Sequence, residues 1–190
     1  MVLGFGKVWR SLAHALQRRS CRVSVCDTDA IRRLQALSEG FVIPNKNIAL
    51  NSSDLVFGAT GFCSLKDKDF PYIRNGAFLI SCSSKKHEFD LESMRSQYRA
   101  TKIAKNVERL ENLSNHFYLL GKGTPINFLD GSAIGPLLFL SHAEMLLAIQ
   151  KLVNRECEIK LQQLDEQTRQ HLATIWIEHF LDQTSGHYKS

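Results

Sequence analysis

The sequence lacks several features that would assign it to a large protein class. None of its five cysteines forms a C-x-x-C pair, and an odd number argues against a disulfide framework. We interpret them as buried free thiols in a reducing compartment. No apolar run approaches the roughly 20 residues that cross a bilayer, and no signal peptide precedes the first glycines. We therefore expect a cytoplasmic protein without a membrane partner.

Long basic runs and metal-binding histidine patterns are also missing. The net charge is only +5, and the short basic pairs are not interleaved with aromatic residues, so nucleic acid is not a favoured partner. The seven histidines show no H-x-x-x-H spacing within one helix, and we expect no metal site. A mild excess of positive charge of this kind suits an anionic cofactor.

Short β-type segments alternate with helical patterns in the first half of the chain. Strands are predicted at residues 1–3, 22–26, 41–43, 54–57 and 77–81, and helices at 7–19 and 29–38. This alternation is typical of an α/β fold, here a three-layer Rossmann-type doubly wound parallel sheet with helices on both faces.

The second half follows a different pattern. A helix is predicted at 91–99, two strands at 117–120 and 126–128 about a turn at 121–125, and long helices at 137–153 and 164–181. In the last helix Leu172, Trp176 and Phe180 are four residues apart and form one stripe, which either packs on the chain's own sheet or forms a homo-oligomer interface. We expect a dinucleotide-binding domain at 1–136 and a C-terminal helical extension with a polar tail at 137–190.

A glycine loop follows the first predicted strand. The first glycine of a dinucleotide fingerprint permits a tight turn, and the second lets the backbone approach the pyrophosphate at the helix N-terminus. Trp9 stands where the fingerprint has its third glycine, and we expect its side chain to push the helix off the sheet or rotate it. The candidate phosphate-binding residues are Gly4, Phe5, Gly6, Lys7 and Val8.

An acidic residue ends the second predicted strand. Asp27 lies twenty-one residues after Gly6, where a carboxylate accepts hydrogen bonds from the adenosine ribose of NAD. The alternative is that Asp27 caps a helix or a loop. Arg32 and Arg33 follow within about one turn, so NADP is not fully excluded. The predicted cofactor is NAD.

Several stretches resemble, in order, the cofactor domain of the S-adenosylhomocysteine hydrolase (adenosylhomocysteinase) family. They are VLGFGKVWRSLAHAL, RVSVCDTDAIRRLQALSEGF, DLVFGATG, NGAFLIS, HEFD, YLLGKGTPINF, QLDEQTRQHLA and the ending HYKS. In that family, tightly held NAD oxidises the 3′-hydroxyl of the adenosyl group so that homocysteine can leave. The resemblance implies that Asp27 stands at the ribose-binding Glu and that Thr60 and Gly61 lie beside the cofactor. It also implies that Asn127 contacts the nicotinamide amide and that Tyr188 reaches a neighbouring subunit's cofactor site.

The chain also departs from this family. The resemblance places Ser84 and Ile134 where the family has histidines, and Thr184 where it has a lysine. The family's adenosyl-binding domain, which carries the main acid, base and lysine groups, is absent from these 190 residues. We therefore expect an NAD-binding module that is inactive alone, and we assign no catalytic residue. We expect it to act in a homo-oligomer or with a partner chain that supplies the substrate domain. The alternatives are a non-catalytic regulatory or interaction protein on a Rossmann scaffold and a small NAD-dependent oxidoreductase.

Overall fold

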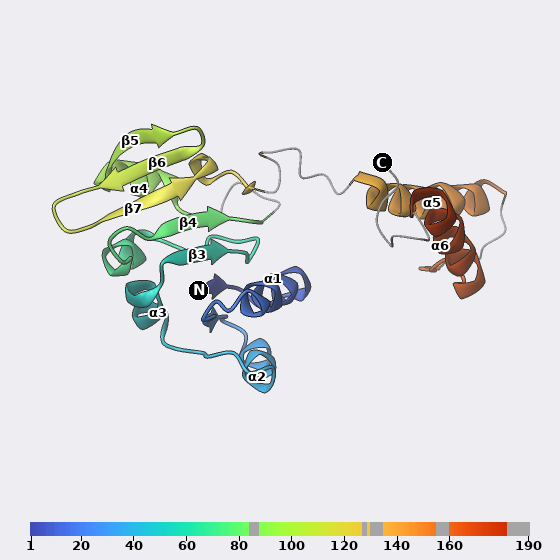
Figure 1. The fold of residues 1–190 in the computed structure, drawn as a ribbon, viewed down its shortest axis with the longest axis horizontal. Coiled ribbons are helices and arrows are strands. Elements are labelled where there is room, and N and C mark those ends of the chain that lie inside the picture. The colour runs from blue at the N-terminus through green and yellow to red at the C-terminus, as the bar shows by residue number, and fades with distance from the viewer. Residues whose placement is uncertain (84–87, 127–128, 130–134, 155–159, 182–190) are drawn as a thin grey trace. The chain divides into compact units, whose positions relative to one another are not determined.

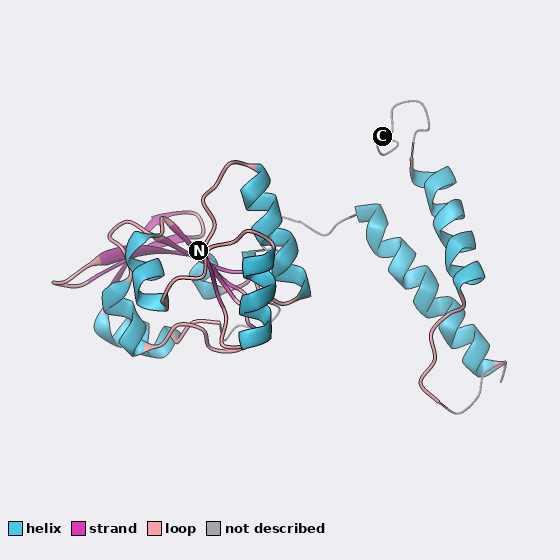
Figure 2. Ribbon diagram, turned by 90° about the horizontal axis from the view of Figure 1, so that it is seen from below, coloured by secondary structure: helices cyan, strands magenta, loops and turns pink. Residues whose placement is uncertain are grey.

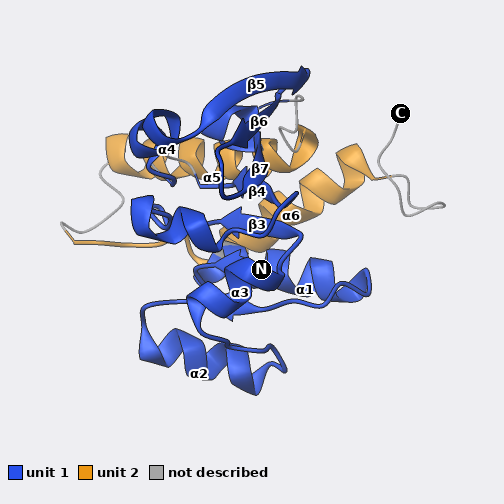
Figure 3. Ribbon diagram, turned by 90° about the vertical axis from the view of Figure 1, so that its left-hand side faces the viewer, with its two compact units in different colours: residues 1–131 blue, residues 132–190 orange. Residues whose placement is uncertain are grey.

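The structure is a computed structural model that describes residues 1–83, 88–126, 129, 135–154 and 160–181. Its contacts divide the chain into two compact units, residues 1–131 and residues 132–190 (Figure 3). Each unit is described separately below.

The described residues of unit 1 form a seven-stranded sheet whose order is β2-β1-β3-β4-β7-β6-β5 (Figure 1). Strand β1 pairs in parallel with both β2 and β3, and β3, β4 and β7 continue the parallel part. A further parallel bridge joins Ser24 to Val42 beside β2. The strands are β1 (Val2–Leu3), β2 (Val25–Cys26), β3 (Leu55–Gly58), β4 (Phe78–Ser81), β5 (Arg99–Ala104), β6 (Val107–Glu111) and β7 (His116–Leu120).

Helices cover both faces of this sheet (Figure 2). They are α1 (Lys7–Arg18), α2 (Ala30–Ser38), α3 (Lys46–Ser52) and α4 (Leu91–Gln97), with the 3₁₀ turns η1 (Asp67–Tyr72) and η2 (Gly121–Gly123). Because successive strand residues point to opposite faces, Val2 and Leu3 enter different hydrophobic clusters. Ala13 of α1 and Ala36 of α2 pack with Val2, which places both helices on that face. These layers confirm the predicted Rossmann-type fold.

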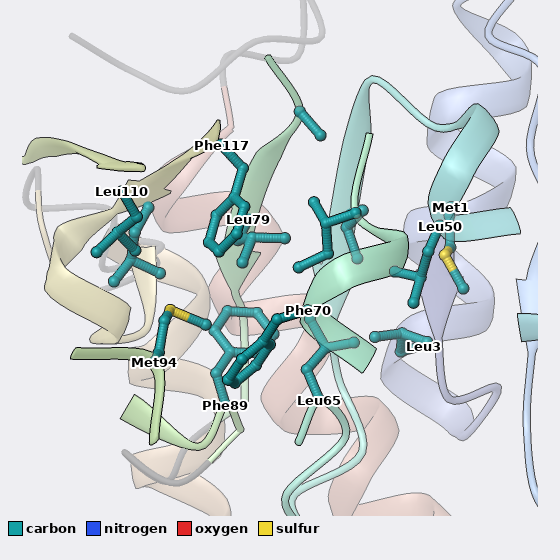
Figure 4. Close-up of a cluster of buried hydrophobic side chains, with 14 of the residues drawn as sticks. Met1, Leu3, Leu50, Leu65, Phe70, Leu79, Phe89, Met94, Leu110 and Phe117 are labelled. Carbon is teal, nitrogen blue, oxygen red and sulfur yellow. The ribbon is translucent and has the colours of Figure 1, made fainter. Parts of the chain in front are cut away.

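The opposite face carries the larger cluster, beneath α3, η1 and α4. Figure 4 shows Phe70, Leu79 and Phe117 among the side chains that fill it, and none of the three is exposed. Met94 of α4 and Leu50 of α3 close the same cluster. Helix α3 was not predicted from the sequence, although Asn45 caps it by accepting the Asn47 N–H at 3.0 Å.

The predicted strand pair about residues 121–125 is wrong. Strand β7 pairs instead with β6, which precedes it, and β6 pairs with β5 through the two-residue turn Lys105-Asn106. Ile126 lies outside the strands, and residues 127–128 lie outside the described part of the chain. The predicted strand at 41–43 is reduced to the single bridge at Val42.

The described residues of unit 2 form α5 (Gly135–Val153) and α6 (Glu166–Phe180). The Trp176 Nε1–H donates to the carbonyl of Pro136 at 2.7 Å, and the rings of Phe139 and Phe180 lie 5.7 Å apart. Trp176 and Phe180 therefore pack against α5. The sequence had suggested the chain's own sheet or a second copy of the chain as their partner, and not this helix.

Helix α5 is long and apolar enough, by length and composition, to cross a membrane, and none of its residues is buried. The expectation that no apolar stretch approaches that length is wrong. Its 19 residues include the charged Glu144. Glu144 lies 3.5 Å from Arg169 of α6, so its charge is paired within the unit.

Candidate nucleotide-binding site

The candidate site lies where the direction of the strand order reverses. Strands β2 and β3 flank β1, so the connections leaving β1 and β3 turn to opposite faces and open a crevice at their carboxyl ends. Gly4 follows β1, Asp27 follows β2 and Ala59 follows β3. The residues that border this crevice therefore come from segments far apart in the sequence.

The glycine loop has the backbone geometry that the fingerprint requires. Gly4 has φ +94°, and a Cβ there would lie 3.1 Å from the carbonyl oxygen of Ala59 and from Thr60 Cγ2. Only glycine takes up that conformation and that close approach without strain. At Gly6 an added Cβ would meet no atom closer than 4.0 Å, so the space above the loop is open.

Helix α1 begins directly after this loop. Gly6 is its N-cap, no side chain caps it, and its first turn contains no acidic residue. The first N–H groups of a helix have no intrahelical partner and carry a partial positive charge. An anion placed above Gly6 would meet these N–H groups.

Trp9 lies one turn into α1. It is partly buried, packs against the same cluster as Ala13, and also lines the cleft. Ala13, one turn further on, is fully buried against the sheet, so α1 keeps its packing with Trp9 present.

The carboxylate of Asp27 connects β2 to the glycine loop. Its Oδ2 accepts the Phe5 N–H at 2.7 Å, and its Oδ1 accepts the Asp29 N–H at 2.8 Å. Only 6% of the Asp27 side chain is exposed. Asp29, and not Asp27, caps α2 by accepting the N–H groups of Ile31 and Arg32. Asp27 accepts two loop N–H groups, as the alternative of a loop carboxylate expected.

A cleft of about 1350 Å³ extends from the glycine loop past α2 toward α3 and η1. This exceeds the roughly 300–1,000 Å³ of typical small-molecule sites, as an extended dinucleotide requires. Cationic residues outnumber acidic ones in its lining. The cations are Lys7, Arg32, Arg33, Lys46, Lys66 and Lys68, and the carboxylates are Asp27, Asp29 and Asp69.

Sequence reasoning missed Glu88, which is only 1% exposed. Its carboxylate accepts the Thr60 N–H at 3.0 Å, the Gly61 N–H at 3.1 Å and the Thr60 hydroxyl at 3.0 Å. A Cβ on Gly58 would lie 2.5 Å from Glu88 Cγ, so a glycine there leaves space for this side chain. Glu88 thus holds the loop after β3 at the edge of the cleft.

Two thiols near the carboxyl ends of the strands are held in the protonated form. Burial raises the pKa of Cys26 and of Cys82 to about 11. Thiols with such values are poor nucleophiles near neutral pH. Ser81, at the end of β4, is fully buried, and its hydroxyl has no hydrogen-bond partner among the described residues.

Six of the nine predicted binding residues that the structure describes line one cleft. Phe5 and Gly61 lie outside this lining: the Phe5 N–H donates to Asp27, which lines the cleft, and the Gly61 N–H donates to Glu88, which does not. Val8 belongs to α1, and Asn127 and Tyr188 lie outside the described residues. In the described part of the chain, no group of three or more His, Cys, Asp or Glu residues is arranged to hold a metal ion. The lining residues that were predicted are Gly4, Gly6, Lys7, Asp27, Arg32 and Thr60.

The donor set fits NAD. The open space above Gly6, which a Cβ would partly fill, lies at the uncapped start of α1, as a pyrophosphate requires. The Asp27 carboxylate lies beside the same loop, as the ribose hydroxyls require.

Comparisons with known proteins agree with this geometry. Residues 1–133 match the family model for the S-adenosyl-L-homocysteine hydrolase NAD-binding domain. The adenosylhomocysteinase of Sulfolobus acidocaldarius is 25% identical over 84% of the chain and 40% of its own length. The adenosylhomocysteinase of Archaeoglobus fulgidus is 24% identical over 94% of the chain and 45% of its own length. That of Sulfurisphaera tokodaii is 27% identical over 67% of the chain and 31% of its own length. The chain thus spans less than half the length of these curated relatives. Because the family model covers most of its residues, the chain belongs to the S-adenosyl-L-homocysteine hydrolase family, whose NAD-binding domain it contains.

Proposed function

We propose that this chain is the cofactor-binding module of an adenosylhomocysteinase-type protein. In this proposal the pyrophosphate lies over Gly4 and Gly6 at the start of α1, and the adenosine ribose hydrogen-bonds to Asp27. The loop of Thr60 and Gly61 borders the nicotinamide half, with Asn127 and, from a neighbouring subunit, Tyr188. When bound, NAD supplies a hydride acceptor, and the protein's own residues bind it, orient it and keep it in the cleft.

The observation that carries the proposal is the bond between Asp27 and the glycine loop. The 2.7 Å hydrogen bond from the Phe5 N–H fixes the ribose carboxylate against the turn that receives the phosphates. This hydrogen bond holds two anchor points for one dinucleotide together. Such preorganisation lowers the ordering cost of binding.

We expect the 190-residue chain to bind NAD without turning over S-adenosylhomocysteine by itself. Ser84 and Ile134 stand where the family resemblance has histidines, and neither side chain titrates near neutral pH to transfer a proton. In this proposal the module is located in the cytoplasm and acts within a homo-oligomer or with a partner chain.

Calorimetric titration of the full chain with NAD tests binding, and Gly6→Ala tests its location. Gly6 has φ −75° and open space at its Cβ, so alanine folds normally but its methyl group enters the phosphate position. We expect NAD to bind at least about tenfold more weakly, a loss of about 1.4 kcal/mol, with an unchanged unfolding midpoint. Ser11→Ala, on the exposed side of α1, is the matched control and leaves NAD affinity unchanged. If millimolar NAD produces no heat of binding, the proposal is refuted.

The replaced histidines favour one second candidate, a non-catalytic regulatory protein that has kept the scaffold. This candidate predicts no bound NAD in the purified protein and no response to added NAD. Absorbance and mass spectrometry of the purified full chain distinguish the two.

A further inference from the structure

The neighbourhood of Asp27 has room and charge for more than a ribose hydroxyl, and the inference drawn from it rests on the proposed NAD site. Aspartate is the shorter of the two carboxylates found at this position in dinucleotide folds. Here both of its oxygens already accept backbone N–H groups, and 94% of the side chain is covered. The carboxylate is therefore held back against the glycine loop.

Arg32 lies over the same place. Its Nη1 is 3.9 Å from Asp27 Oδ2 and 4.0 Å from the position of a Cβ on Gly6, so the guanidinium spans the ribose carboxylate and the phosphate loop. Its Nε is 3.8 Å from Asp29 Oδ2. The separations from Asp27 and Asp29 are those of loose ion pairs and exceed hydrogen-bond length, and among the described residues the guanidinium makes no hydrogen bond.

The guanidinium is ion-paired with Asp27 and Asp29 only at 3.8–3.9 Å, and its five N–H donors form a planar fork that matches phosphate oxygens. Half of the Arg32 side chain is exposed, so it can turn toward a ligand in the cleft. The flanking Lys7 and Arg33 also line the cleft, and together these three cations outnumber the two carboxylates Asp27 and Asp29. An added phosphate on the ribose would therefore enter a region of net positive charge.

From this geometry we propose that Arg32 forms a subsite for a 2′-phosphate, so that the cleft accepts 2′-phosphorylated dinucleotides such as NADP as well as NAD. Asp27 still accepts from the 3′-hydroxyl, while its withdrawn position leaves space at the 2′ position. An arginine near this carboxylate is the usual partner of a 2′-phosphate in Rossmann domains.

The test is the affinity of the full chain for defined probes at pH 7.5 and 0.15 M salt. The probes are NAD, NADP, adenosine 2′,5′-bisphosphate and adenosine 3′,5′-bisphosphate. The last two carry the same groups at different positions, so their comparison separates a 2′-phosphate subsite from general attraction of anions. The variant is Arg32→Gln, and the charge-matched control is Arg22→Gln, an exposed residue outside the cleft lining.

We expect NADP to bind within about tenfold of NAD, and the 2′,5′-bisphosphate to bind at least about fivefold more tightly than the 3′,5′ isomer. Arg32→Gln should weaken NADP by about tenfold and NAD by less than about threefold, while Arg22→Gln changes neither.

Three results overturn the inference while leaving the NAD site intact. In the first, NAD binds but NADP binds more than tenfold more weakly. In the second, the two bisphosphates bind with equal affinity. In the third, Arg32→Gln weakens the binding of NAD and of NADP equally. If no dinucleotide binds at all, the proposed function fails instead. Thermal unfolding of both variants confirms that they are folded.

Discussion

Replacing Glu88 by glutamine tests whether this buried carboxylate organises the cleft. The substitution keeps the size of the side chain, so it creates no cavity. It replaces one carboxylate oxygen by an NH₂ group, which cannot accept the N–H or hydroxyl donors of Thr60 and Gly61. One of the three donors then loses its partner, and the other two keep only a neutral acceptor.

The expected magnitude follows from these three bonds. A hydrogen bond to a charged group contributes about 1.5–3 kcal/mol and a neutral one about 0.5–1.5 kcal/mol. Losing one bond and weakening two therefore costs about 4–5 kcal/mol, and removing a buried charge recovers roughly half of this. We expect a net loss of about 2 kcal/mol in the free energy of unfolding. With a urea m value of about 2 kcal/mol/M, the midpoint falls by about 1 M.

Trp9 fluorescence provides the measurement, because Trp176→Phe leaves one tryptophan, and it lies in unit 1. Urea unfolding and NAD titration are followed in this background. Because the loop after β3 lines the cleft, we expect Glu88→Gln to weaken NAD as well. Glu92→Gln, at an exposed position in the first turn of α4, is the control and should change stability by less than about 1 kcal/mol. Equal effects of the two variants on stability and on NAD affinity would contradict the role given to Glu88.

Two further predictions concern the cleft thiol and unit 2. NAD should slow the alkylation of Cys63, which is exposed and lines the cleft, but not that of Cys21, which is exposed outside it; peptide mass spectrometry measures both, and equal rates with and without NAD would place the ligand elsewhere. In unit 2, hydrogen bonds from the Lys151 ammonium and then from the first turn of α6 lower the pKa of Asp165. Because this pKa is lower in the folded state, the ionised carboxylate stabilises the fold at pH values above its unfolded-state pKa, which is near 4. This stabilisation is lost as the pH falls through the folded-state pKa. Asp165→Asn should therefore lower the unfolding temperature at pH 7, by a difference that shrinks at pH 3. Trp176 fluorescence, with the other tryptophan replaced by phenylalanine, reports this, and a difference independent of pH would show that the charge is not its source.

The sequence predicted the part of the fold that local signals determine. Strand β1 has two residues, yet the glycine turn after it and the helical spacing that follows are sufficient to locate it. The position of Asp27 was predicted by its distance from Gly6, because one crossover helix separates the carboxyl ends of β1 and β2.

The β5–β6 hairpin was missed because its sequence carries no burial pattern. All six residues of β5 are exposed, so the alternation of polar and apolar residues that marks a half-buried strand is absent. The turn itself offered a signal. Asn106 has φ +63°, and asparagine is one of the few residues that adopts this conformation readily. Glu88 offered none, since its role depends on Gly58 and Thr60, about thirty residues earlier.

The two buried carboxylates of the site, Asp27 and Glu88, have the same role. Each comes from the segment that follows one strand and binds backbone N–H groups of the loop that follows another, β1 for Asp27 and β3 for Glu88. Protonation of either carboxylate would weaken these charge-assisted bonds, so both are suited to hold loops in place. With these two carboxylates bound to backbone N–H groups, the cleft presents mainly lysine and arginine side chains to a ligand. A site built in this way is suited to hold the pyrophosphate of a dinucleotide.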